Sequence, residues 1–339
     1  MSRKLLSYVA SSLILGSTAI AEVPKVAVDI APVHSLVSRV MEGLDSPKLI
    51  IPASVSPHEY SLRPSEAKSL QEADMVIWIG EDLAPWMKKS IETLSKNAEV
   101  VTLLEESSTK LLEFREGVLF EEHDHGDHDD HGDHDDHGDH DDHDDHDDHD
   151  HDKDHDDHDD HGDHDGHAHG EHDPHAWLST ENAQTWLNLV AGKLSAADPE
   201  NAGVYFANAA AAREEINDLV KEVNSILEPV RGRNFVVFHD AYQYFETSFE
   251  FPAAGAISLG DANDPSAARI AEIQDRVKDE GINCVLSEPQ FNANLVETVT
   301  SGTDAKTGVI DPLGLGLEPG PKLYGDLIRN MGKALAGCL

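Results

Sequence analysis

The chain has 339 residues, which is enough for two domains of ordinary size with hydrophobic cores. It contains 66 acidic and 25 basic residues, and its net charge is -41. Such acidity argues against nucleic acid and anionic membrane surfaces as partners, because like charges repel, and it favours cations.

The N-terminus has the three parts of a secretory signal peptide. Arg3 and Lys4 give a positive start, residues 5–15 form a short apolar run, and a small-x-small motif ends at Ala21. The apolar run is too short to span a membrane. We therefore expect cleavage after Ala21, a periplasmic mature protein and no stable membrane insertion; a buried N-terminal helix is the alternative.

Apolar strand-like runs alternate with helix-like stretches along residues 22–200, the expected N-terminal lobe. The runs are "KVAVDIAP", "KLIIPASV", "DMVIWIG" and "EVVTLLE", and stretches such as "HSLVSRVMEGL" lie between them. Strands that alternate with helices and are almost continuously apolar predict a parallel sheet covered by helices. This lobe is expected to hold roughly four parallel strands.

One insert, residues 123–172, interrupts this lobe. It contains 18 His, 23 Asp, one Glu and one Lys, so its net charge is about -23. Because it has almost no apolar surface to bury, we expect it to be disordered. Its imidazoles and carboxylates predict additional weak sites for Zn²⁺ and other divalent ions, and an expansion without a role is the alternative.

A long helix is predicted in the next segment, residues 201–231. Apolar residues recur at helical spacing, and no Gly or Pro occurs from Val204 to Glu228. At 1.5 Å per residue this helix is roughly 40 Å long. A helix of that length would join two lobes and leave a cleft between them, where ligands of α/β proteins bind.

Residues 232–339 repeat the alternation and form the expected C-terminal lobe. The strand-like runs here are "NFVVFHD", "FEFPAAGAIS", "INCVLSEPQ" and "TGVIDPLG". The predicted fold is therefore α/β, with two similar lobes, each a roughly four-stranded parallel sheet with flanking helices, joined by one long helix. Cys284 and Cys338 are the two cysteines, and in an exported protein an even pair indicates a disulfide; two free buried thiols are the alternative.

Four histidines lie outside the insert, and three of them stand near strand ends or polar turns. His58 follows the second strand, His175 precedes a helix, and His239 ends the strand "NFVVFHD". Asp311 lies at a fourth strand end. Three imidazoles and one carboxylate match the ligands that zinc prefers, and the ends of parallel strands converge on one edge. The remaining histidine, His34, is expected to cap or pack a helix.

Five motifs follow one another along the chain: "SVSPHEYSLRPSEAKSLQEADMVIWIGEDLAPWM", "DPHAWLS", "FVVFHDAYQYFE", "CVLSEPQF" and "DPLG". In these motifs and in their order the chain resembles the zinc-uptake solute-binding proteins of bacterial ABC transporters, the ZnuA type. The family forms part of a cluster of metal-binding lipoprotein- and adhesin-like receptors. The resemblance covers essentially the whole mature chain and implies two α/β lobes, a joining helix and a metal in the cleft.

The resemblance also implies one tight Zn²⁺ on His58, His175 and His239. Pro57 stands where some zinc-binding relatives have an acidic residue before the first histidine, so the fourth position is left to Asp311, Glu59 or water. Manganese-binding relatives have a carboxylate in place of His239, and a third imidazole favours zinc. The implied partners are an ABC permease and its ATPase, and we expect a monomer.

Two other classes of function stay open on the sequence. A periplasmic zinc buffer or an adhesin-like metal receptor would use the same ligands. A zinc hydrolase would keep an activated water at the open position, but the chain has no His-Glu-x-x-His motif and no evident general base. We therefore expect a zinc-delivering protein rather than an enzyme.

Overall fold

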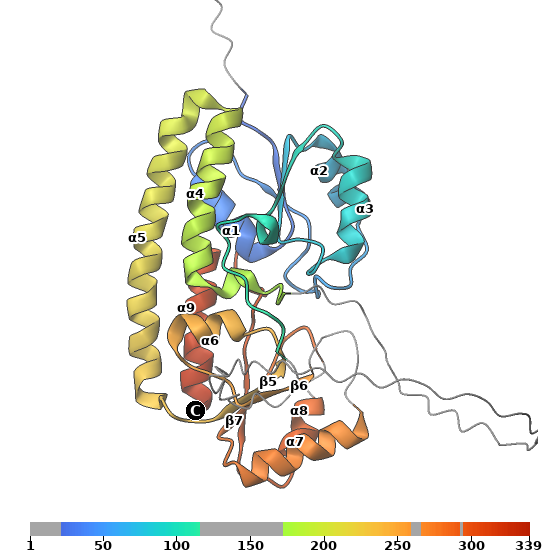
Figure 1. Cartoon of the computed structure of the whole chain (residues 1–339), viewed down its shortest axis with the longest axis vertical. Coiled ribbons are helices and arrows are strands. Elements are labelled where there is room, and N and C mark those ends of the chain that lie inside the picture. Colours follow the sequence, from blue (N-terminus) through green and yellow to red (C-terminus); the bar gives the residue numbers. More distant parts are fainter. Residues whose placement is uncertain (1–21, 116–171, 259–265, 292–293) are drawn as a thin grey trace, which may run out of the picture. The chain divides into compact units, whose positions relative to one another are not determined.

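The computed structural model describes residues 22–115, 172–258, 266–291 and 294–339, which form two parallel four-stranded sheets with their helices (Figure 1). The first sheet has the order β2-β1-β3-β4. Its strands are β1 (Val26–Val28), β2 (Lys48–Leu49), β3 (Met75–Trp78) and β4 (Glu99–Thr102). The second sheet has the order β6-β5-β7-β8. Its strands are β5 (Phe235–His239), β6 (Gly255–Ser258), β7 (Cys284–Ser287) and β8 (Lys306–Val309). The predicted pair of four-stranded parallel sheets is confirmed.

Both sheets share one order of connection, in which the second strand lies on one side of the first, and the third and fourth lie on the other. The direction of winding therefore reverses between β1 and β3, and again between β5 and β7. Ligands of open α/β sheets bind at the carboxyl ends of strands beside such a reversal. In the first sheet Asp29 follows β1 there, and its carboxylate accepts hydrogen bonds from the backbone N–H groups of Ile30 and Ile79.

Short helices connect the strands within each lobe. In the first lobe they are α1 (Ala31–Val40), α2 (Pro64–Glu72) and α3 (Pro85–Leu94). Each of these has a proline in its first turn. The backbone N–H groups of a first turn have no acceptor within the helix, so the N–H that proline lacks costs no hydrogen bond there. In the second lobe they are α6 (Gln243–Phe249), α7 (Ala267–Asp279) and α8 (Asn294–Thr300).

Two longer helices, α4 (Thr180–Ala197) and α5 (Ala202–Leu227), pack side by side (Figure 1). The helix α5 has 26 residues, which corresponds to about 39 Å. It is the long helix that the sequence predicts. The joining turn between α4 and α5 is a short 3-10 helix, Pro199–Asn201.

A second helix, α9 (Leu323–Cys338), also connects the lobes, and the sequence did not predict this connection. At its start, the backbone N–H of Tyr324 donates to the Ser35 hydroxyl of α1. At its end, Cys338 forms a disulfide with Cys284 at the start of β7, with the two Cα atoms 5.8 Å apart. The predicted disulfide is therefore confirmed, and it fixes α9 to the second sheet.

The hydrophobic core is continuous from the first sheet through α4, α5 and α9 to one face of the second sheet. A smaller cluster covers the other face, where Val236 and Phe238 of β5 meet Ile273 and Val277 of α7. This division follows from the alternation of side chains along a strand. The two lobes thus share one core along the helices, which favours small relative movements over wide opening.

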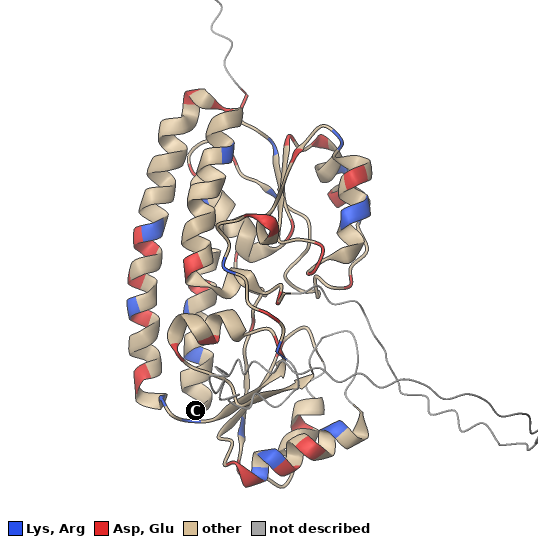
Figure 2. Ribbon diagram, viewed as in Figure 1, with Lys and Arg blue, Asp and Glu red and all other residues tan. Residues whose placement is uncertain are grey.

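Acidic and basic residues alternate along the exposed helices, as on α7 (Figure 2). Within the residues that the structure describes, no helix combines the length and the apolar composition needed to cross a membrane. The predicted signal peptide, residues 1–21, lies outside the described residues, and so does the insert up to residue 171. The described chain resumes at His172, which pairs with Glu113 in an isolated antiparallel bridge.

Candidate metal centre

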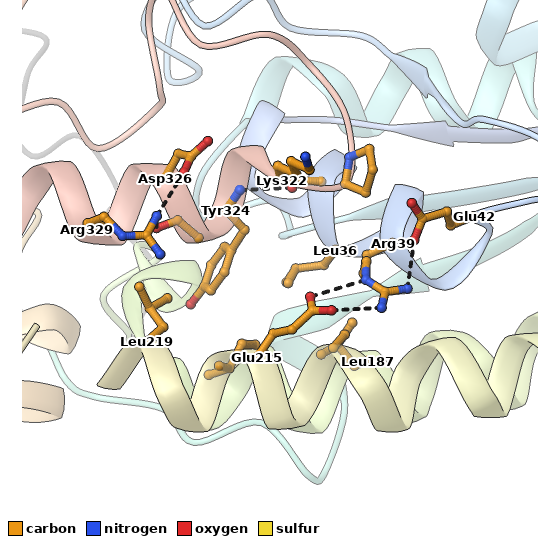
Figure 3. A pocket seen from close by; sticks show the side chains of 15 residues that line it. Leu36, Arg39, Glu42, Leu187, Glu215, Leu219, Lys322, Tyr324, Asp326 and Arg329 are labelled. Carbon is orange, nitrogen blue, oxygen red and sulfur yellow. Dashed lines mark hydrogen bonds and ion pairs between the residues drawn. The ribbon is translucent and has the colours of Figure 1, made fainter. Parts of the chain in front are cut away.

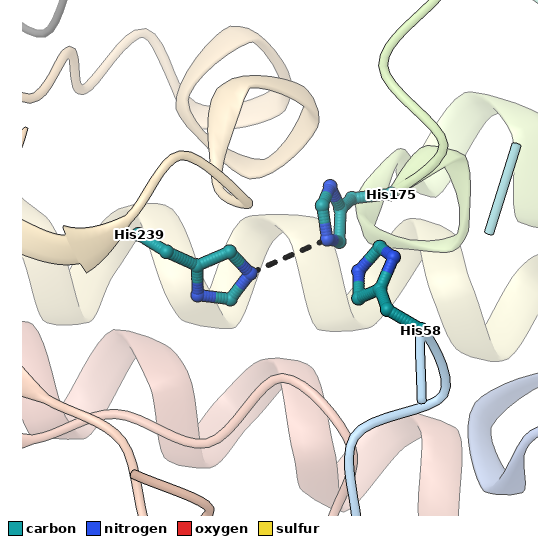
Figure 4. A group of neighbouring side chains, drawn as sticks. All are labelled: His58, His175 and His239. Atoms are coloured by element: carbon teal, nitrogen blue, oxygen red, sulfur yellow. Dashed lines mark hydrogen bonds between the residues drawn. The ribbon is translucent and has the colours of Figure 1, made fainter. Parts of the chain in front are cut away.

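Three histidines from distant parts of the sequence meet between the two sheets (Figure 4). His58 lies in the loop between β2 and α2, His175 directly precedes the 3-10 helix Ala176–Leu178, and His239 is the last residue of β5. Each offers one ring nitrogen, and these three atoms lie within 4.8 Å of one another. His175 and His239 are buried, whereas His58 is half-buried.

The spacing of the two buried rings fits a tetrahedral zinc site. The Nε2 atoms of His175 and His239 are 3.4 Å apart. Zinc binds imidazole nitrogen at about 2.0–2.1 Å, and two ligands of a tetrahedron at that radius lie about 3.3–3.4 Å apart. The distance between these nitrogens is therefore the distance that one shared ion requires.

Buried carboxylates orient the same two rings. The Nδ1 atom of His175 lies 2.7 Å from Asp173 Oδ1, and the Nδ1 atom of His239 lies 2.6 Å from Glu288 Oε1. A carboxylate beside each Nδ1 favours the tautomer that has its proton there, so that each Nε2 can act as a ligand. A cation shared by the two Nε2 atoms would replace the contact that they make with each other.

The ionisation of Asp173 also suits a bound cation. Burial raises the pKa of Asp173 to about 7, although the backbone N–H of His175 and the charge of Arg115 act in the opposite direction. An ion on His175 would favour the charged carboxylate, because an opposite charge nearby lowers a carboxyl pKa. Asp173 is thus an acceptor for the ring and would be a counter-charge for a bound cation.

The loop that carries His58 is held by two hydrogen bonds. The indole Nε1 of Trp86 on α3 donates to the carbonyl of Pro57 at 2.9 Å, and the backbone N–H of His58 donates to Ser56 Oγ at 3.2 Å. The ring centroids of His58 and His175 lie 5.5 Å apart. The first lobe therefore presents His58 to the pair of buried rings from its own anchored loop.

The three rings line a cavity of about 20 Å³. A cavity holds a water molecule when its volume exceeds roughly 10–15 Å³, so this one suits a single ion or a single small ligand. The rest of its lining comes from both lobes and is largely apolar: Ser56, Pro57, Trp177, Glu288, Gln290, Phe291, Pro312 and Leu313.

A larger cavity of about 390 Å³ lies between α1, α5 and α9 (Figure 3). Its guanidinium groups are already paired: Arg39 with Glu215, and Arg329 with Asp326. The residues described along its wall include no histidine or cysteine. This cavity has none of the features of a transition-metal site, so the small cavity is the candidate centre.

The structure does not bring the two other sequence candidates into the group of three histidines. Among the described residues, the group of His, Cys, Asp and Glu side chains with ligand atoms this close consists of the histidines alone. Asp311 follows β8, and its Oδ1 accepts from the backbone N–H groups of Leu313 and Gly314 and from Gln290 Nε2. Glu59 is exposed. Zinc ligation by Asp311 stays a prediction.

His34 has the packing role expected from the sequence. It is buried in α1, its Nε2 lies 3.1 Å from the carbonyl oxygen of Pro47, and its Nδ1 lies 3.4 Å from Ser38 Oγ. Burial lowers its pKa, and the Pro47 carbonyl only partly opposes this effect. Both ring nitrogens of His34 thus have protein partners, and His34 does not belong to the group of three histidines.

A buried ion cluster lies next to His239 in the second lobe, and the sequence did not reveal it. Arg115 bonds to both carboxylate oxygens of Asp240, the residue after His239, and to both oxygens of Glu246 on α6. Tyr244 adds a second link, since its hydroxyl accepts from Leu112 N and donates to Asp173 O. Both ends of the described chain around the insert are therefore fixed to α6 and to the end of β5.

The sequence of the chain is similar to a known protein family and to named proteins. The model of a family described as "Zinc-uptake complex component A periplasmic" matches residues 26–338. A Brucella abortus (strain 2308) protein named "High-affinity zinc uptake system protein ZnuA" is 47% identical over 324 residues, which cover 96% of this chain and 94% of that protein. A protein of the same name from Paracoccus denitrificans (strain Pd 1222) is 47% identical over 329 residues, with 96% and 95% covered.

The fold has counterparts among solved structures as well. One described as "Crystal structure of ZnuA" matches with a TM-score of 0.69 and 19% identity, covering 93% of this chain and 98% of that one. The "Zn(II)-bound ZnuA-like domain of Streptococcus pneumoniae AdcA" matches with a TM-score of 0.62 and 22% identity, covering 93% and 98%. At these identities the likeness supports the fold alone.

Proposed function

Because this chain belongs to the zinc-uptake complex component A family of periplasmic proteins, we propose that it captures Zn²⁺ between its lobes and delivers it to an ABC permease. The observation that carries the proposal is the convergence of three imidazoles on one small cavity, with two Nε2 atoms 3.4 Å apart. The ligands we propose are His58, His175 and His239. The ion is cargo, so binding has to be tight and also reversible.

Selectivity for zinc follows from the donor set. Three neutral imidazoles form a softer site than one with carboxylate ligands, which suit manganese and magnesium. The carboxylates of Asp173 and Glu288 touch the rings instead of the ion, and such contacts raise the basicity of the ligand nitrogens. Zinc therefore gains a basic tetrahedral site without a charged ligand in contact with it.

Members of this family are transport components and not enzymes, so the hydrolase alternative is set aside. The proposed partners are the permease and its ATPase, and the proposed compartment is the periplasm after cleavage at Ala21. The small volume of the cavity supports delivery, because it has room for one ion and leaves no space for an organic substrate. Monomeric action is part of the same proposal.

The insert has an accessory role in this proposal. Its 18 histidines and 23 aspartates provide weaker sites that bind and concentrate divalent cations. Capture in the insert followed by transfer to the three histidines would raise the rate of loading at low zinc concentration. A buffering role for the insert is compatible with delivery, because the two uses involve different ligands.

Growth of a deletion strain on chelated medium tests delivery. We expect the wild-type gene to restore growth, and a triple variant, His58→Ala with His175→Ala and His239→Ala, to fail although it retains the whole insert. As a matched control, His34→Ala removes a histidine of the first lobe that is remote from the cavity. Restoration of growth by the triple variant would contradict delivery through this centre.

A further inference from the structure

Gln290 lines the small cavity, and its amide oxygen has not yet been given a role. It lies shortly after β7 and lines the same cavity as the three histidines. Its amide Nε2 donates to the Ala53 carbonyl oxygen of the first lobe at 3.0 Å and to Asp311 Oδ1 of the second lobe at 3.3 Å. Both partners are acceptors, so they fix which end of the amide is nitrogen.

The amide oxygen of Gln290 is buried and has no hydrogen-bond partner. Four side-chain atoms of the described residues share this condition, and Gln290 Oε1 is the one that belongs to the lining of the metal cavity. A buried acceptor without a donor is costly and calls for an explanation such as a missing water or ion. The nitrogen of the same amide is fixed, so the oxygen cannot exchange places with it to find a donor.

A ligand in the fourth coordination place of a bound ion would supply a donor to this oxygen. Three imidazoles leave a tetrahedral zinc ion with one open position, and among the described carboxylates none joins the group of possible ligand atoms. The Oδ1 atom of Asp311 already accepts three hydrogen bonds. A water molecule bound to zinc carries two protons, each of which can be donated.

We propose that Gln290 is a positioning residue for the captured ion: its amide oxygen accepts a hydrogen bond from a water molecule that occupies the fourth place. This inference rests on the proposed function. It assigns water, and neither Asp311 nor Glu59, to the position that the sequence left open.

An amide at this place suits transport better than catalysis. Its oxygen accepts a hydrogen bond but cannot take the proton, so it favours bound water over hydroxide, which is the weaker donor. A carboxylate at the same place would act as a general base and generate the nucleophile of a zinc hydrolase. Gln290 therefore keeps the fourth ligand neutral and easily exchanged, which suits an ion that has to leave.

The test uses the full chain loaded with one equivalent of Co²⁺, whose visible absorption reports the coordination shell, together with zinc affinity from chelator competition. In the wild type, raising the pH should produce one spectral transition as the bound water ionises. In Gln290→Met the transition should move to lower pH by about one unit, and zinc affinity should fall about 10–100-fold. Gln274→Met is the matched control, because Gln274 lies on α7 away from the cavity and should leave both readouts unchanged.

A second variant separates the amide oxygen from the amide nitrogen. Gln290→Glu keeps an acceptor oxygen and loses the donor to Ala53 and Asp311, so its zinc affinity should stay within about tenfold of the wild type. Affinity as low as that of Gln290→Met would overturn the proposal, because the nitrogen contacts would then be what matters. An unmoved transition in Gln290→Met, or no transition in the wild type, would overturn it as well. A wild-type chain without any tight site would refute the proposed function itself.

Discussion

Removing the Arg115 guanidinium should strongly destabilise the zinc-free protein. Arg115 is bonded to Asp240 and Glu246, and the exposed fractions of the three side chains are 16%, 4% and 5%. Burial alone would lower the pKa of Arg115, but Glu246 and Asp240 hold it above its ordinary value. The substitution Arg115→Met keeps most of the alkyl chain and leaves two carboxylates buried without a counter-charge.

The expected cost follows from that burial. Breaking a buried ion pair by removing one partner costs about 3–5 kcal/mol, because the remaining charge cannot be solvated. Solvent screening does not reduce this figure much here, since all three side chains are well below one-third exposed. We therefore expect Arg115→Met to lower the free energy of unfolding by about 3–5 kcal/mol at pH 8.

The loss should shrink in acid, and the direction follows from the two carboxyl groups. Burial raises the pKa of both Asp240 and Glu246, and Arg115 opposes that rise, so its removal raises both further. A group whose pKa is higher in the folded state binds more protons there, so stability falls as the pH rises from its unfolded pKa of about 4 to its folded pKa. The deficit of the variant is therefore smaller at pH 5 than at pH 8.

Urea unfolding of the zinc-free full chain at pH 5 and pH 8, followed by far-UV circular dichroism, measures both effects. Lys88→Met is the control, because it removes one partner of the exposed Lys88–Glu81 pair and should leave the midpoint unchanged. A loss below about 1 kcal/mol at pH 8, or an equal loss at both pH values, would mean that Asp240 and Glu246 do not depend on Arg115 as a buried counter-charge.

Three further predictions concern the ring partners, the disulfide and the insert. Asp173→Asn and Glu288→Gln should each weaken zinc binding about 10–100-fold in chelator competition. The exposed Asp218→Asn is the control, and unchanged affinity in the first two variants would contradict the assigned ring orientation. Cys284→Ser combined with Cys338→Ser should lower the free energy of unfolding by about 4 kcal/mol, because the disulfide closes a loop between cysteines 54 residues apart and so lowers the entropy of the unfolded chain. A loss near zero would contradict this effect on the unfolded chain. Deletion of residues 123–172 should remove the weaker zinc equivalents and leave one tight equivalent; loss of the tight equivalent would place that site in the insert.

Much of the fold was predictable because the apolar runs are short, regular and separated by helical stretches. Eight such runs correspond to the strands β1 to β8, and the uninterrupted apolar spacing near residue 216 predicted α5. The second connection through α9 was not predictable. The amphipathic pattern of α9 indicates a helix, but the contacts of Tyr324 with α1 depend on how the lobes come together.

The same limit applies to the candidate metal centre. His58, His175 and His239 could be selected because so few histidines lie outside the insert and because parallel strand ends converge. Asp173 could not be singled out from the sequence, because it directly follows the aspartate-rich insert. Glu288 follows β7 as a polar residue after an apolar run, a signal that the sequence contained but that did not by itself single it out.

Arg115 could not be predicted, because its partners lie 125 and 131 residues away along the chain. The position of a side chain near a strand end is likewise not fixed by the sequence. Asp311 follows β8 as expected, but its Oδ1 accepts hydrogen bonds from backbone N–H groups of the next turn and from the amide of Gln290. The sequence placed Asp311 after a strand, and only the backbone geometry decides which way the carboxylate faces.

The proposed function requires one tight zinc ion on three histidines outside the insert. Zinc titration of the full chain by calorimetry, alongside His58→Ala, His175→Ala and His239→Ala, measures whether that ion binds there. We predict one tight equivalent in the wild type, its loss in each variant, and weaker equivalents that persist in all four proteins. A tight equivalent that survives in any of the three variants would contradict the account.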